Sequence, residues 1–188
     1  RLGISGLVAP MVESPFAVSK FINSVRSKCN LLSIPEPKKF INLETIDACT
    51  RSAEILEAHH KELDGIVVGR SDLSKSMGLE KKNVNDKKVI DVVRSTLKNA
   101  KKYGLQTKMG GTVSLESVKV IKSLFSEGVL DRFETRAVVF TIQDTSNILK
   151  SVKAALNYEQ MLLQKRHHLH KIKANFFNER VESIEKRK

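Results

Sequence analysis

The sequence contains no tryptophan, two tyrosines, eight phenylalanines and two cysteines. Aromatic side chains that could stack on bases make up only 5% of the residues, which disfavours nucleic-acid binding despite a net charge of +12. Cys29 and Cys49 both fall at apolar positions of predicted helices, so we expect reduced, buried thiols in a cytoplasmic protein rather than a disulfide framework. The five histidines have no zinc-finger spacing, which disfavours a structural zinc site.

Long hydrophobic runs are also missing. None approaches the roughly 20 residues needed to span a bilayer, and no signal-peptide pattern begins the chain, so we expect no membrane partner. The length of 188 residues suits one core with an appendage. Positive charge is uneven, because residues 145–188 hold ten Lys and Arg against four Glu.

Short apolar runs alternate with helical patterns along the first three quarters of the chain. The predicted strands are Gly6–Met11, Lys39–Glu44, Gly65–Gly69, Leu105–Met109 and Phe133–Ile142, and the helices between them are 15–29, 45–60, 87–103 and 114–127. Regular alternation of this kind predicts a parallel sheet with right-handed crossovers. An open doubly wound sheet and part of a (β/α)8 barrel both fit.

The last 44 residues, 145–188, contain neither Gly nor Pro and have apolar residues at intervals of three, four and seven. They predict a helix of roughly 60 Å at 1.5 Å per residue, which either packs on another subunit or breaks near Arg166. We therefore divide the chain into residues 1–143 and a helical extension, 144–188, expected to mediate homo-oligomerisation. We interpret its basic, His-rich run 165–171 as a solvated helix turn, with an anion or metal site as the alternative.

Two carboxylates follow neighbouring predicted strands. Glu44 ends the second strand, and Asp72 lies just beyond the third, 28 residues later. In a parallel barrel both would lie on the same rim, on strands about 5 Å apart. Oxygen ligands without nearby Cys or His suit a hard divalent cation, Mg²⁺ or Mn²⁺. The alternative for Asp72 is a cap of the turn 73–77.

Other candidates lie around these acids. Gly110-Gly111 follows the fourth strand, where it suits either close backbone approach to an anion or a tight strand-to-helix turn. Arg70 could reach a phosphate or a second carboxylate, or could be a surface charge. The polar stretch 77–86 is a candidate active-site loop.

Three motifs in this order resemble the HpcH/HpaI aldolase and citrate lyase β-subunit superfamily. They are Ala9-Pro-Met-Val-Glu13, Asn42-Leu-Glu-Thr45 and Leu63-Asp-Gly-Ile-Val-Val-Gly-Arg-Ser-Asp-Leu-Ser74, the last of which is the most specific. The resemblance covers about residues 2–143. It implies a (β/α)8 TIM barrel of the phosphoenolpyruvate/pyruvate type, of which the last five βα units are present.

The resemblance also implies a function. It suggests a carbon–carbon lyase that acts on a 2-oxo acid and an aldehyde through a metal-stabilised enolate, with Glu44 and Asp72 as the metal-binding acids. Substrate contacts are expected from Asn42, Gly69, Ser71, Gly110 and Gly111, and a catalytic role from Arg70. The alternatives are a citrate-lyase-like enzyme acting on acyl-CoA thioesters and a non-catalytic anion-binding oligomerisation module.

Two departures accompany the resemblance. Asn42 stands where the pyruvate aldolases usually have Gln, and Arg70 stands where they usually have Pro. By the family pattern the first three barrel units, with their arginine and histidine-containing dyad, lie outside this sequence. We therefore expect a C-terminal piece of a longer protein, a sequence that lacks its beginning, or a degenerate product that needs a partner.

Overall fold

A computed structural model describes residues 3–187. Its strands are β1 (Gly6–Ala9), β2 (Lys38–Leu43), β3 (Gly65–Gly69), β4 (Gln106–Gly110), β5 (Arg132–Glu134) and β6 (Val139–Thr141). Its α-helices are α1 (Pro15–Leu32), α2 (Ile46–Thr50), α3 (Ser52–His59), α4 (Arg70–Ser76), α5 (Lys87–Lys102), α6 (Ser117–Ser126) and α7 (Ile148–Glu185). Two 3₁₀ turns complete it, η1 (His60–Glu62) and η2 (Lys81–Asn85).

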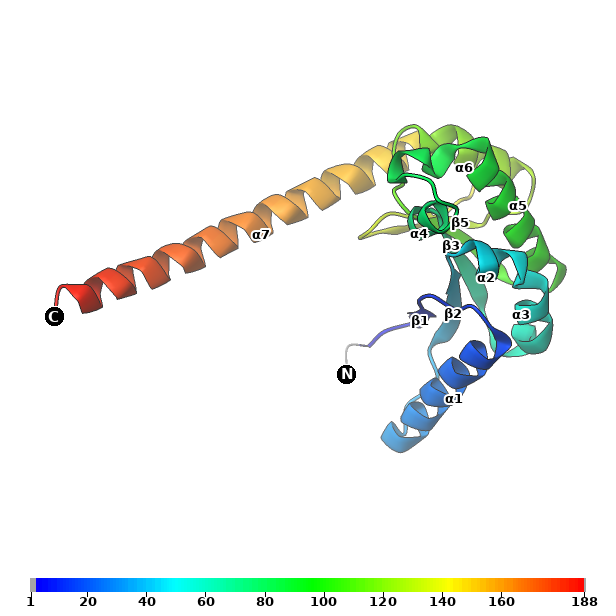
Figure 1. The fold of residues 1–188 in the computed structure, drawn as a ribbon, viewed down its shortest axis with the longest axis horizontal. Helices are drawn as coiled ribbons and strands as arrows, with labels where there is room; N and C mark the ends of the chain where they lie inside the picture. Colours follow the sequence, from blue (N-terminus) through cyan, green and yellow to red (C-terminus); the bar gives the residue numbers. More distant parts are fainter. Residues whose placement is uncertain (1–2, 188) are drawn as a thin grey trace.

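The six strands form one sheet in the order of the sequence. β1 to β5 run parallel, each joined to the next by a helical crossover, and β6 pairs antiparallel with β5. Helices α2, α3, α5 and α6 form an arc along one side of the strands (Figure 1). The result is a curled, half-barrel α/β sheet, consistent with part of a barrel.

Strand alternation separates the two faces of this sheet. Ile41, Ile66, Val68 and Met109 are completely buried and belong to the core between the sheet and the helices. Their neighbours along each strand point to the other, concave face. The concave side chains of β2 to β5 are Lys38, Phe40, Asn42, Val67, Gln106, Lys108, Arg132 and Glu134, with glycine at 65, 69 and 110. The concave face is therefore mostly polar.

Local signals explain several helix starts. Ser14 has extended backbone and its hydroxyl accepts a hydrogen bond from the amide of Ala17, with Pro15 as the first helical residue. Thr45 caps α2 in the same way through the amide of Ala48. Both starts agree with the sequence-based prediction. The predicted second helix is nevertheless divided into α2 and α3 at Arg51, whose backbone (φ −89°, ψ 9°) departs from helical values.

The last predicted strand, 133–142, is wrong as a single parallel strand. The chain reverses within it, and the amide of Thr135 donates to the carbonyl of Val138 (2.9 Å) to close the turn between β5 and β6. The amide of Ala137 donates to Glu159 of α7 (3.1 Å), which ties the hairpin to the last helix. A run of alternating apolar residues fits one strand or two short ones equally well, so only the tertiary contacts distinguish them.

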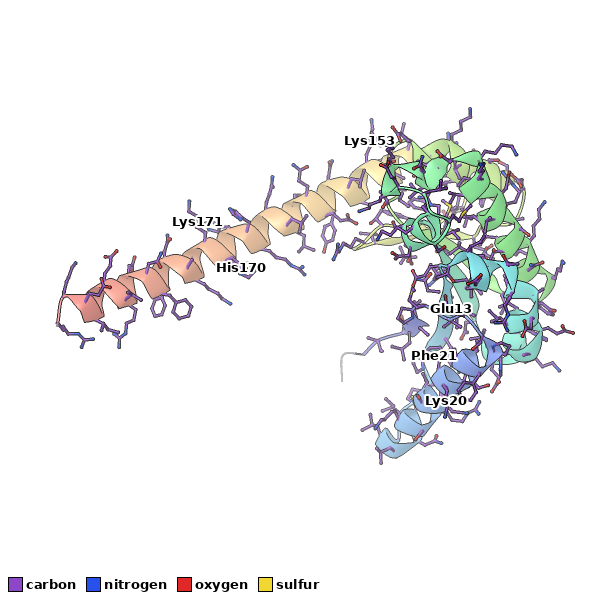
Figure 2. All side chains as sticks on the ribbon, in the orientation of Figure 1. Glu13, Lys20, Phe21, Lys153, His170 and Lys171 are labelled. Carbon is purple, nitrogen blue, oxygen red and sulfur yellow. The ribbon has the colours of Figure 1, made fainter. Side chains whose placement is uncertain are left out.

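Helix α7 continues without a break through residues 166–168, contrary to one of the two expectations for the tail. Its 38 residues extend over about 57 Å. Ile148, Val152 and Ala155 are buried against the body, whereas every residue from 163 to 187 is exposed. Figure 2 shows Lys153 beside the body, and His170 and Lys171 on the part of α7 that projects away from it. No described helix is long and apolar enough to cross a membrane.

Candidate active site

Glu44 directly follows β2 and is 7% exposed. Its Oε1 accepts a hydrogen bond from the amide of Met11 (3.0 Å), and its Oε2 accepts one from the side-chain amide of Asn42 (2.6 Å). Burial raises the pKa of the Glu44 carboxyl, the Met11 and Asn42 hydrogen bonds oppose this, and the nearby Asp72 carboxylate raises it further. Glu44 is therefore an acid at the carboxyl end of its strand that two hydrogen bonds hold in place, while burial and Asp72 disfavour its ionised form.

Asp72 lies in the first turn of α4, immediately after β3. It does not cap that helix, because the structure extends α4 back to Arg70 and gives the N-cap position to Gly69. The side chain is 49% exposed and forms an ion pair with Lys75 (3.2 Å). Such a solvent-exposed pair is weak, so the Asp72 carboxylate remains accessible to a ligand.

Gly69, the last residue of β3, lies beneath the Glu44 side chain. A Cβ at this position would come within 2.6 Å of Glu44 Oε2 and 3.2 Å of Asn42 Oδ1. Glycine is therefore required for Glu44 to extend over the neighbouring strand. The structure thus brings three of the predicted residues together, Asn42, Glu44 and Gly69.

Gly110 and Gly111 end β4 and turn toward the start of α4. Gly111 has φ +79°, and a Cβ there would lie 2.5 Å from the backbone nitrogens of both Arg70 and Ser71. The Ser71 hydroxyl lies 2.7 Å from that of Thr112, which joins the two loops. These glycines therefore allow both a tight turn after β4 and the close approach of that turn to the backbone of Arg70 and Ser71.

The structure corrects both expectations for Arg70. Its side chain is completely buried and its five N–H donors each have an acceptor. The acceptors are the carbonyls of Val84, Gly110 and Gly111, Asn85 Oδ1 and Ser117 Oγ. Burial lowers the pKa of Arg70 to about 10. Arg70 is neither a surface charge nor free to contact a substrate, and it fastens the Gly110–Gly111 turn and η2 to α4.

The oxygen atoms around Glu44 fit a hard cation. Asn42 Oδ1 is buried without a hydrogen-bond partner among residues 3–187, and it faces the same side of Gly69 as Glu44 Oε2. No cluster of three or more Asp, Glu, His or Cys suitable for a metal occurs in the described part of the chain. Two carboxylates with neutral oxygens are a common Mg²⁺ arrangement, in which water and substrate complete the coordination.

The sequence-based reasoning missed Lys108 and Glu134, which both lie on the concave face. Lys108 is 6% exposed, and its Nζ lies 3.5 Å from the centre of the Phe40 ring. The Glu134 carboxylate forms no hydrogen bond or ion pair with residues 3–187, and its Oε1 would be 3.0 Å from a Cβ on Gly110. The sequence signal that could have indicated Lys108 and Glu134 was a polar residue at every second position of a short strand.

A shallow cleft of about 410 Å³ lies elsewhere, at the amino ends of β4 and β5. Its wall includes Lys101 and Asp131, which pair at 2.6 Å, so their charges are already compensated. Chemistry in parallel α/β folds is found at the carboxyl ends of the strands. We therefore assign the candidate site to the end that holds Glu44 and Asp72.

The fold is similar to that of several solved structures. An HpcH/HpaI aldolase from Desulfitobacterium hafniense superposes with a TM-score of 0.55 at 14% identity, covering 71% of this chain and 57% of that one. A citrate lyase from Burkholderia xenovorans gives 0.60 at 12% identity, covering 70% and 44%. The citrate lyase beta subunit from M. tuberculosis, solved with oxaloacetate and magnesium, gives 0.52 at 13%, covering 80% and 61%. Each of these likenesses concerns the fold alone.

The chain spans less than two thirds of the length of these solved structures. None of the curated protein sequences matches it significantly. Residues 1–119 match the family described as HpcH/HpaI aldolase/citrate lyase, and this match covers more than half of the chain. The chain therefore belongs to the HpcH/HpaI aldolase/citrate lyase family.

Proposed function

We propose that this protein is a divalent-metal-dependent carbon–carbon lyase that acts on 2-oxo acids. The observation that carries the proposal is the buried Glu44 carboxylate, which shares its end of the sheet with Asp72 and is disfavoured as an anion by burial and by that second charge. A cation between these acids would compensate both charges. The family assignment and the oxaloacetate and magnesium in the M. tuberculosis relative support the same class of chemistry.

In this proposal Glu44, Asp72 and the unpaired Asn42 Oδ1 hold Mg²⁺ or Mn²⁺. When bound, the ion acts as a Lewis acid toward the carboxylate and 2-oxo oxygens of the substrate. The chain's own contribution is orientation. The Met11 amide and the Asn42 amide fix the direction of the Glu44 oxygens, and glycine at 69 leaves room for the Glu44 carboxylate over β3.

Metal binding can be tested directly. We expect Glu44→Gln and Asp72→Asn each to weaken Mn²⁺ binding at least about tenfold, measured by calorimetry or by electron paramagnetic resonance. Asp47→Asn is a matched control, because Asp47 is an exposed acid in the first turn of α2, at the same end of the sheet. Unchanged Mn²⁺ affinity in both site variants would exclude this metal site.

The substrate class is tested by hydrogen exchange. We expect the protein with Mn²⁺ to exchange the methyl protons of pyruvate in D₂O, followed by proton NMR. Exchange of the acetyl-CoA methyl protons in place of those of pyruvate would favour the thioester-dependent alternative. Metal binding without exchange on either compound would favour a non-catalytic module.

We also propose that α7 mediates self-association. The part of the helix that projects from the body carries apolar side chains that are exposed in the structure. They are Leu163, Leu169, Ile172, Phe176, Phe177, Val181 and Ile184. A continuous row of this kind on one helix is typical of a surface that is covered in an assembly.

A further inference from the structure

The register of the sheet aligns four residues across the concave face. Gly69 pairs directly with Gly110, and the pairs Leu43–Val68, Val68–Met109 and Met109–Phe133 lie one position earlier. The residues that follow, Glu44 and Glu134, are therefore level with the two glycines. The row reads Glu44, Gly69, Gly110, Glu134 across four adjacent strands.

The two outer carboxylates lean toward each other over the inner glycines. Glu44 Oε2 would be 2.6 Å from a Cβ on Gly69, and Glu134 Oε1 would be 3.0 Å from a Cβ on Gly110. Adjacent strands are about 4.8 Å apart, so these oxygens are separated by at most roughly 10 Å. The two glycines leave room for these carboxylates, because each acid lies where the side chain of its inner neighbour would be.

The two acids differ in their surroundings. Glu44 accepts hydrogen bonds from Met11 and Asn42, whereas Glu134 has no such partner within the described chain. Burial raises the pKa of Glu134, Lys108 opposes this, and Glu44 adds to it. Lys108 itself is more than nine-tenths buried and donates to no described acceptor, being held on the Phe40 ring. The concave face thus contains a hydrogen-bonded acid, Glu44, an acid without such a partner, Glu134, and the buried cation Lys108.

We propose that Glu134 is a catalytic proton-transfer residue of this site. This inference rests on the proposed lyase function. A 2-oxo acid bound at the end of the sheet that holds Glu44 and Asp72 would meet Glu134 at the same level of the concave face. The Glu134 carboxylate takes a proton from the methyl carbon of the 2-oxo acid, the C–H electron pair forms the C=C bond of the enolate, and the carbonyl π pair moves onto oxygen. In the reverse step the same proton returns.

The test compares metal binding with proton exchange in the same variants. We expect Glu134→Gln to lower the exchange of pyruvate methyl protons at least about 100-fold, while its Mn²⁺ affinity stays within about twofold of the parent protein. Glu134→Asp, which shortens the side chain but keeps the acid, should retain part of the exchange. Glu116→Gln, an exposed acid before α6, should change neither quantity. Circular dichroism and thermal unfolding verify that each variant is folded.

Each remaining outcome is decisive. Exchange at the parental rate in Glu134→Gln overturns the proposal, and so does an equal loss of Mn²⁺ affinity, which would make Glu134 a metal ligand. Absence of exchange in the parent, with Mn²⁺ or with chelator, also overturns it. Exchange that depends on Glu134 but persists in chelator would support Glu134 and instead refute the metal-dependent function.

Discussion

Arg70 Nε donates a hydrogen bond to the carbonyl oxygen of Gly110 over 3.0 Å, in the interior of the protein. The same side chain reaches Gly111 (3.1 Å), so one cation fastens the whole turn after β4 to the start of α4. Among residues 3–187 no carboxylate pairs with it, and its charge is balanced by carbonyl and hydroxyl dipoles. Such an arrangement stabilises the fold only while every partner is in place.

Removal of the Arg70 side chain should therefore destabilise the folded protein. We expect Arg70→Met to lower the free energy of unfolding by at least about 3 kcal/mol, because several buried carbonyl groups lose their donor. Urea denaturation measures the loss, and amide hydrogen exchange should show faster exchange at residues 110–112. Arg51→Met is the control, since its ion pair with Glu54 is exposed to solvent and should contribute much less to the free energy of unfolding. A similar decrease in the free energy of unfolding in the two variants would contradict the proposed structural role of Arg70.

A side chain at Gly69 should disturb the candidate metal site. In Gly69→Ala the new methyl group would meet Glu44 Oε2 at 2.6 Å, so the carboxylate must move. We expect Mn²⁺ affinity to fall about tenfold or more. Gly6→Ala places the same group on the same face of β1, where the nearest atom is 3.5 Å away, and should leave Mn²⁺ affinity unchanged.

The stability of the metal-free protein should show the raised pKa of Glu44. The folded state holds the Glu44 proton more tightly than the unfolded chain does, so stability falls as the pH rises from the ordinary carboxyl value through the raised pKa. Over that pH range, the melting temperature of the parent protein should fall relative to that of Glu44→Gln. Added Mn²⁺ should restore it at neutral pH, because the ion binds the ionised form. A pH-independent difference between the two proteins would contradict this assignment.

If α7 mediates self-association, charged residues introduced into its exposed apolar surface should weaken the assembly. The double variant Leu169→Arg, Phe176→Arg should sediment as a smaller species than the parent in analytical ultracentrifugation, because it interrupts the exposed apolar row. Asn175→Arg adds positive charge to the same exposed stretch without removing an apolar side chain, and should sediment like the parent. If the parent is already monomeric at high concentration, α7 does not mediate self-association.

Local patterns in the sequence determined the order and the parallel arrangement of the first five strands, but neither α4 nor the chain reversal into β6. They also determined the positions of Glu44 and Asp72, because each acid directly follows an apolar run and parallel strands all end on one rim. The starts of the first two helices were readable for the same reason, since a helix start depends on residues within one turn, and the structure adds that Ser14 and Thr45 cap them.

Only the tertiary structure decided the rest, because it depends on contacts between distant segments. Nothing near Arg70 in sequence indicates that its partners lie at Val84, Gly110 and Ser117. The hairpin at β5 and β6 is likewise held in part by Glu159 of α7. Glu134 became a candidate only through the register of four strands, which no local pattern encodes.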